Sequence, residues 1–189
     1  MRFLMYVVFL LGLGLLPVSS VAAQSKTNPA VLLGKPAQPW QVSTWVNSKP
    51  LTLSGLKGKV VLVRWWTSGC PFCENTAPAL NEFATRYQPQ GLQVVGLYHH
   101  KAETPLTVGH VKRTARKLGF TFPIGIDNDW KNLRSWWLDP LPEADFTSVT
   151  FLIDRQGVIR FIHPGGQYVK GEAAYDEMGR QIETLLRQK

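Results

Sequence analysis

The chain has 189 residues, 44 % of them hydrophobic, and a formal net charge of +8. This length fits one domain with a sizeable hydrophobic core. The basic residues are dispersed, apart from a cluster over 112–117 that is most simply a solvated helix face. The charge therefore gives no reason to expect nucleic-acid binding.

The first 23 residues have the pattern of a signal peptide. Arg2 precedes an apolar run over 3–16, and the small residues Val21 and Ala23 stand where a signal peptidase cleaves. Cleavage would leave Gln24 first and place the protein outside the cytoplasm, most simply in a bacterial periplasm. The alternative is an uncleaved membrane anchor, although the run is short for a spanning helix and is interrupted by glycine and proline.

Residues 24–38 form a polar lead-in that we expect to be loosely structured, and the folded domain is expected over 39–189. The domain opens with the alternating pattern of an edge strand over 41–46, and 51–53 is the expected hairpin partner of that strand. The nearly continuous apolar run over 60–66 predicts a strand buried on both faces.

A helix is expected over 70–87, because apolar residues recur there at helical spacing. The later elements alternate between helices and strands. We expect helices over 105–118, 128–137 and 172–186, strands over 92–98, 149–154 and 158–163, and an extended segment over 120–126. This order predicts an α/β fold, in which helices cover both faces of a central mixed sheet, with an N-terminal β-hairpin extension.

The most informative feature is the sequence Cys70-Pro71-Phe72-Cys73, which contains both cysteines of the chain. A disulfide across two intervening residues closes too short a ring to add much stability. Redox chemistry or metal binding is the better explanation of the pair.

At the start of the predicted helix, Cys70 lies where unpaired amides and the helix dipole favour a thiolate. We therefore expect Cys70 to have a lowered pKa and to act as the nucleophile. Cys73, one turn later, can resolve a mixed disulfide at Cys70. Pro71 suits the first helical position, and Phe72 is expected to present an apolar rim.

Other uses of two such cysteines need further ligands. A c-type haem site would require histidine in place of Glu74, and a tetrahedral zinc site would need two more ligands. A Cu(I)-binding metallochaperone remains an alternative, because one of the four histidines could join the thiols: His99, His100, His110 or His163. The expectation is a site without metal or cofactor.

Several segments in this order resemble the TlpA/redoxin group of exported thiol–disulfide oxidoreductases, which is related to the AhpC/TSA proteins and has a thioredoxin-like fold. The segments are 58–66, Cys70 to Cys73 with Pro78, 91–96 and 151–160. Residues 127–130 and 165–168 are also similar to the periplasmic thioredoxin-like domain of DipZ-type proteins.

The resemblance implies dithiol–disulfide exchange with protein thiols and disulfides of the cell envelope, with Cys70 and Cys73 as the redox-active pair. It also implies a membrane electron donor as a further partner. We expect a monomer that contacts the membrane only if its N-terminal segment is uncleaved. The groove that receives the partner is expected to be framed by Trp66, Pro71, Phe72, Ser148 and Val149.

Two departures from the family pattern concern this groove. Ser148 stands where the family has a cis-proline, and a trans bond there would turn the serine hydroxyl and amide toward Cys70. Gly69 stands where a tryptophan is common, which widens the expected groove.

Two further departures concern charge. Arg64 replaces a buried aspartate, and Thr76 replaces a glutamate of some relatives, so the usual proton acceptor for Cys73 is missing. Glu74 or Glu103 could act through water, although each is more simply a surface carboxylate. If Arg64 lies under the site, its charge favours a thiolate and makes the protein more oxidising; if it reaches the surface, it is structural.

A thiol peroxidase is the remaining alternative, because redoxins include peroxidases. Thr67 stands three residues before Cys70, as in the peroxidase motif, but Val63 occupies the position of the proline in that motif.

Overall fold

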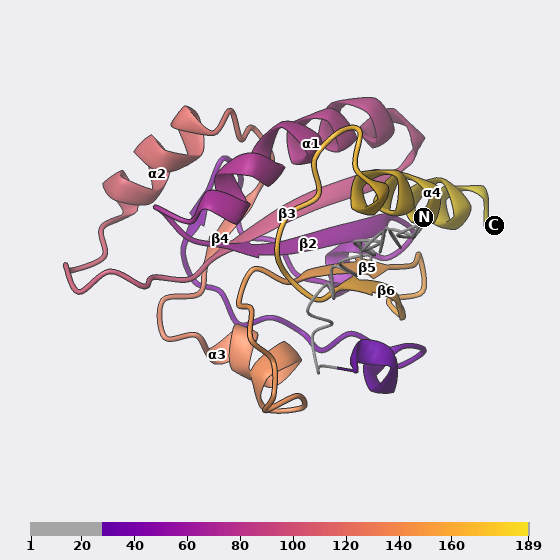
Figure 1. Ribbon diagram of the computed structural model, residues 1–189, viewed down its shortest axis with the longest axis horizontal. Coiled ribbons are helices and arrows are strands. Elements are labelled where there is room, and N and C mark those ends of the chain that lie inside the picture. Colours follow the sequence, from indigo (N-terminus) through magenta and orange to yellow (C-terminus); the bar gives the residue numbers. More distant parts are fainter. Residues whose placement is uncertain (1–27, 189) are drawn as a thin grey trace, which may run out of the picture.

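The computed structural model describes residues 28–188, which contain a six-stranded mixed sheet in the order β1-β4-β3-β2-β5-β6 (Figure 1). The strands are β1 (Trp45–Val46), β2 (Val60–Trp66), β3 (Leu92–Tyr98), β4 (Ile124–Ile126), β5 (Thr150–Ile153) and β6 (Ile159–His163). The central strands β2, β3 and β4 are parallel, whereas β1, β5 and β6 run antiparallel to their neighbours. The predicted α/β fold with a mixed sheet is confirmed.

Helices cover both faces of the sheet. They are α1 (Pro71–Tyr87), α2 (Val108–Lys117), α3 (Lys131–Leu133), which continues into a π-helical turn over Arg134–Leu138, and α4 (Ala173–Arg187). Figure 1 shows α1, α2 and α4 above the sheet and α3 below it. Within residues 28–188, no helix combines the length and the apolar character needed to cross a membrane.

Strand β2 lies at the centre of the molecule, and all seven of its residues are buried. Leu62 and Trp66 pack with apolar residues of α1 and α4, whereas Val63 and Trp65 pack with the layer that contains α3. A strand with one core on each face requires an unbroken apolar run, which is why the pattern over 60–66 predicted its position correctly.

The predicted N-terminal hairpin is wrong. The strand over 41–46 shortens to β1, which pairs with β4 instead of with 51–53. Asn47 follows β1 with a φ of 65°, and its side-chain amide donates to the carbonyl groups of Phe120 and Phe122. These bonds tie the end of β1 to the segment that leads into β4, while the chain after 53 enters a 3-10 turn over Ser54–Leu56.

Residues 28–38 are more structured than we expected. A 3-10 turn over Pro29–Leu32 buries Leu32, and Pro36 forms an isolated antiparallel bridge with Val158. The chain therefore packs onto the β6 edge before residue 39. The predicted signal peptide over 1–23 lies outside the described residues.

Asp127, directly after β4, joins α3 to the sheet. This carboxylate is buried and accepts hydrogen bonds from the indole of Trp65, from the backbone and side-chain nitrogens of Asn132, and from the backbone nitrogen of Leu133. The Asp127 side chain thus provides the hydrogen-bond acceptor for the first turn of α3 and for the indole of a buried tryptophan on the central strand.

The substitution Asp127→Ala is expected to lower the free energy of unfolding by about 3 kcal/mol, because it leaves buried donors without an acceptor. Asp129→Ala provides the matched control, since Asp129 is exposed and accepts from the backbone nitrogen of Lys131. This control is expected to lower the free energy of unfolding by about 1 kcal/mol or less. Urea unfolding of the three proteins measures both effects, and equal losses would contradict the role assigned to Asp127.

Candidate active site at the end of β2

The two cysteines lie where β2 ends and α1 begins, at the carboxyl edge of the parallel strands. In α/β sheets this edge is where ligand sites gather. After Trp66, the chain passes through Gly69, whose φ of 69° is in the left-handed region, and reaches Cys70 at the N-cap of α1. The left-handed backbone favours glycine at position 69, since a residue with a Cβ is disfavoured there.

Cys70 and Cys73 are both free thiols, and their sulfur atoms lie 2.7 Å apart. Cys70 is half-buried, whereas Cys73 is only 2 % exposed. The thiol of Cys73 donates to Cys70 Sγ, and the backbone nitrogen of Cys73 donates to the same sulfur at 3.3 Å. The pair therefore presents one partly accessible sulfur, on Cys70, and one buried thiol, on Cys73, in direct contact.

The surroundings separate the two pKa values. The bond from the Cys73 thiol, the backbone amide of Cys73 and the charges of Arg64 and Lys101 together lower the pKa of Cys70 to about 6, against the opposing effect of burial. The same thiol–sulfur bond and burial raise the pKa of Cys73 far above its ordinary value. At neutral pH the pair thus carries one proton, on Cys73, and one negative charge, on Cys70.

Arg64 lies under the site and not at the surface. Its side chain is 0 % exposed, Nη1 donates to Thr150 Oγ1 at 3.1 Å, and Nη2 donates to the carbonyl of Gly166 at 2.8 Å. The ring of Tyr168 lies 5.4 Å from the guanidinium carbon. Of the two interpretations of Arg64, the one that places its charge beneath the cysteines is correct.

None of the three candidate residues, Thr76, Glu74 and Glu103, places a carboxylate beside Cys73. Thr76 is fully buried, donates to the carbonyl of Phe72 at 2.7 Å and accepts from the backbone nitrogen of Tyr168. Glu74 and Glu103 are exposed. Both are therefore surface carboxylates, as the simpler interpretation of the sequence proposed.

The rim of the site is aromatic. Phe72 is 42 % exposed, and its ring packs edge-to-face against Phe146 at 5.8 Å. Pro71 is exposed beside it. The predicted role of Trp66 in the groove wall is wrong, because this side chain is 1 % exposed and packs in the core. Phe146, the ring in contact with Phe72, was not indicated by the sequence, because no motif surrounds it.

Ser148 and Val149 lie in the loop before β5, and both side chains are buried. The carbonyl of Val149 accepts from the backbone nitrogen of Trp65, which holds this loop against the end of β2. No cis peptide bond occurs within residues 28–188. The hydrogen bonds shown for this part of the chain do not include one from Ser148 to Cys70, so the expected serine donor is not present.

His99, which directly follows β3, anchors the same loop. Its Nε2 lies 2.9 Å from Thr147 Oγ1, and its ring packs edge-to-face on Trp130. Burial and the charges of Lys101 and Arg64 lower the pKa of His99 to about 3. His99 is therefore a neutral side chain with a structural role. The sequence had indicated its place at the sheet edge but not this role.

A chain of hydroxyl and imidazole groups holds the loop that precedes Cys70. Ser68 Oγ lies 3.1 Å from the hydroxyl of Tyr98 and 3.0 Å from His110 Nε2, and the Tyr98 hydroxyl lies 3.1 Å from His100 Nδ1. The sequence did not indicate this network, because α2 and β3 bring its members together from distant positions.

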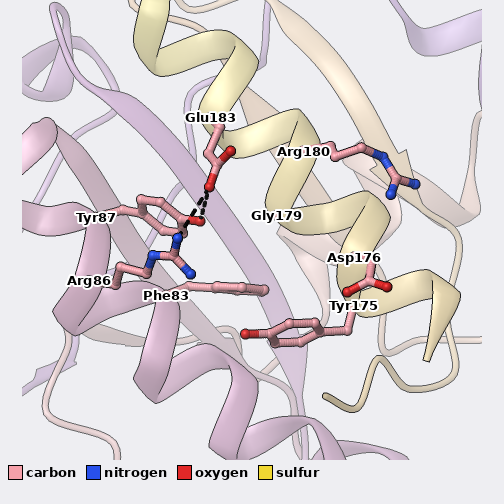
Figure 2. A pocket seen from close by; sticks show the side chains of 8 residues that line it. All are labelled: Phe83, Arg86, Tyr87, Tyr175, Asp176, Gly179, Arg180 and Glu183. Atoms are coloured by element: carbon pink, nitrogen blue, oxygen red, sulfur yellow. Dashed lines mark hydrogen bonds and ion pairs between the residues drawn. The ribbon is translucent and has the colours of Figure 1, made fainter. Parts of the chain in front are cut away.

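Metal-ligand clusters and pockets are the other features that could form a site within residues 28–188. Among the described residues there is no group of three or more His, Cys, Asp or Glu side chains that could hold a metal ion. A pocket of about 280 Å³ lies between α1 and α4, where Glu183 accepts from Tyr87 and pairs with Arg86 (Figure 2). Its lining includes no cysteine or histidine, and it lies along the last turns of α1.

Comparison with known proteins identifies the family of the chain. Residues 33–162 match the AhpC/TSA family. The thiol-disulfide oxidoreductase ResA of Geobacillus thermodenitrificans is 31 % identical over 179 residues, which cover 95 % of this chain and 92 % of that protein. Protein DipZ of Mycobacterium tuberculosis is 30 % identical over 154 residues, 78 % of this chain, but the chain spans only 19 % of DipZ.

A solved structure gives the same result for the fold. A thiol-disulfide isomerase from Corynebacterium glutamicum is similar with a TM-score of 0.63 and 25 % identity, over 81 % of this chain and 98 % of that chain. The fold and the cysteine pair thus define the class of thioredoxin-like thiol–disulfide oxidoreductases. The chain belongs to the AhpC/TSA family, which confirms the resemblance drawn from its segments.

The pH dependence of alkylation tests whether Cys70 is a thiolate at neutral pH. The rate of reaction of the reduced protein with iodoacetamide is expected to rise with pH around a midpoint near 6, because the thiolate is the reactive form. In Cys73→Ala the midpoint is expected to move up by about one pH unit or more, since the main donor to Cys70 is lost. A wild-type midpoint near 8.5, the ordinary value for cysteine, would contradict this assignment.

Proposed function

We propose that this protein exchanges disulfides with the thiols of other proteins outside the cytoplasm, through Cys70 and Cys73. The observation that carries the proposal is the half-buried Cys70 sulfur at the N-cap of α1, which accepts from both the thiol and the amide of Cys73. A thiolate at this position is a nucleophile with the second thiol already in contact.

The exchange proceeds through a mixed disulfide. The Cys70 thiolate attacks one sulfur of a partner disulfide, the partner's sulfur–sulfur bond breaks, and the second partner sulfur leaves as a thiolate. Cys73 then loses its proton and attacks Cys70 Sγ, the bond between Cys70 and the partner sulfur breaks, and that sulfur leaves as a thiolate. The partner has gained two electrons and becomes a dithiol by taking the proton of Cys73 and one proton from water. The reverse sequence oxidises a partner dithiol and reduces the Cys70–Cys73 disulfide.

The partner surface is formed by the exposed side chains of Pro71 and Phe72, with Phe146 beside them. An apolar aromatic rim next to a reactive sulfur suits an extended polypeptide better than a small charged ligand. Export is supported by the signal-like pattern over 1–23, and an electron donor in the membrane and a monomeric state are part of the same proposal.

The two alternatives have less support. A Cu(I) carrier that used a histidine beside the thiols would require a ligand cluster, and residues 28–188 contain no group of three candidate ligands. A thiol peroxidase would require the proline of the peroxidase motif, and the residue at that position is the buried Val63 of β2.

Substitution of each cysteine tests the mechanism with a peptide that contains one disulfide. Cys70→Ser is expected to abolish exchange, a loss of at least about 1,000-fold, because the nucleophile is removed. Cys73→Ser is expected to attack the peptide and then stop, so the mixed disulfide accumulates and is detected by mass spectrometry. Exchange that survives in Cys70→Ser would show that another group is the nucleophile.

A further inference from the structure

The buried guanidinium of Arg64 is surrounded by groups that carry no negative charge. Its two hydrogen-bond partners are a threonine hydroxyl and a backbone carbonyl, and the ring of Tyr168 lies over it. Burial raises the pKa of Tyr168, so this phenol stays neutral. Burial and Arg64 lower the pKa of His163 to about 4, so this neighbour is neutral as well.

The buried carboxylates of the described chain are engaged elsewhere. Asp127 accepts from Trp65, Asn132 and the start of α3, and Asp154 pairs with Arg160 and accepts from the backbone of the β5–β6 turn. The ion pairs found within residues 28–188 do not include Arg64, and its Nε is buried without a hydrogen-bond partner. A buried cation in this situation is unfavourable unless an anion forms near it.

The groups near Arg64 that can become anionic are the two cysteines. The backbone nitrogen of Tyr168, whose ring covers the guanidinium, donates to Thr76, three residues after Cys73 on α1. The charge of Arg64 favours the thiolate form of both cysteines. Cys73 is the more deeply buried of the two, so water screens its charge least.

We infer that Arg64 is the counter-ion of the negative charge that the cysteine pair carries once the Cys70–Cys73 disulfide opens, first on Cys73 in the mixed disulfide and then on Cys70 in the dithiol form, and that the protein is therefore a disulfide donor. This inference rests on the proposed exchange function and assigns it a direction. A carboxylate in the same place would instead repel a leaving thiolate and serve as a proton acceptor for a reductant.

The electrons and protons of the donor reaction balance. A partner thiolate attacks Cys70 Sγ, the bond between Cys70 and Cys73 breaks, and Cys73 leaves with the electron pair beside Arg64. The second partner thiolate then attacks the partner sulfur of the mixed disulfide and releases Cys70 as a thiolate. The partner loses two electrons and two protons; the Cys73 thiolate takes up one of these protons and water takes the other. A second, more oxidising protein disulfide restores the Cys70–Cys73 disulfide.

The test compares Arg64→Gln, which removes the charge but keeps hydrogen-bond donors, with Arg64→Lys, which keeps the charge. Each protein is equilibrated at pH 7 in glutathione redox buffers and its disulfide fraction is measured. Arg64→Gln is expected to shift the exchange equilibrium about tenfold toward the disulfide form, which corresponds to about 30 mV for a two-electron couple. Arg64→Lys is expected to stay within about threefold of the wild type, because the charge is retained.

A second pair of variants leaves Arg64 in place and decides the matter if Arg64→Gln does not fold. Thr150→Asp supplies the missing carboxylate at a position 3.1 Å from Nη1, and Thr150→Asn is its uncharged match. The aspartate variant is expected to shift the equilibrium in the same direction as Arg64→Gln, and the asparagine variant is expected to resemble the wild type.

The outcomes separate the inference from the function on which it rests. Equal equilibria for Arg64→Gln and wild type, or equal shifts for both members of either pair, would overturn the role of Arg64 and leave disulfide exchange intact. Failure of the wild-type cysteines to equilibrate with glutathione at all would overturn the proposed function itself.

Discussion

The burial of the Arg64 guanidinium without a carboxylate is the constraint on which the chemistry of this protein depends. A charge inside a β-sheet is tolerated when its donors are satisfied and an anion can form beside it. Thr150 and Gly166 satisfy part of the guanidinium, and the cysteines provide the anion. The dithiol form, with a thiolate at Cys70, therefore fits this core better than the uncharged disulfide does.

The rest of the fold holds the two sulfurs in place relative to that charge. Strand β2 has a core on each face and carries Arg64 two residues before its end, so the position of the guanidinium is set by the sheet. The loop to Cys70 is held by Ser68 through Tyr98 and His110, and the opposite loop is held by His99 through Thr147. Hydrogen bonds thus hold the loops on both sides of the cysteines, and the aromatic rim at Phe72 remains exposed.

Local patterns predicted the centre of the fold and the cysteine pair, because those features depend on neighbouring residues. The apolar run of β2 and the N-cap position of Cys70 are examples. The hairpin over 41–53 and the groove role of Trp66 were wrong, since the pairing of β1 with β4 and the packing of Trp66 depend on distant segments. Phe146 was not predicted for the same reason: its contact with Phe72 joins residues 74 positions apart in sequence.

The most direct measurement is the free energy of unfolding of the dithiol and disulfide forms between pH 5 and pH 9. The account predicts that the stability of the dithiol form relative to the disulfide form rises from about pH 5 to about pH 8.5. Between about pH 6 and about pH 8.5, Cys70 has lost its proton in the folded chain, where its pKa is about 6, but keeps it in the unfolded chain. Above about pH 8.5 the difference is expected to fall, because folded Cys73 keeps a proton that the unfolded chain has lost. A difference that does not change with pH, or one that is largest at pH 5, would contradict the claim that the fold stabilises a thiolate at Cys70.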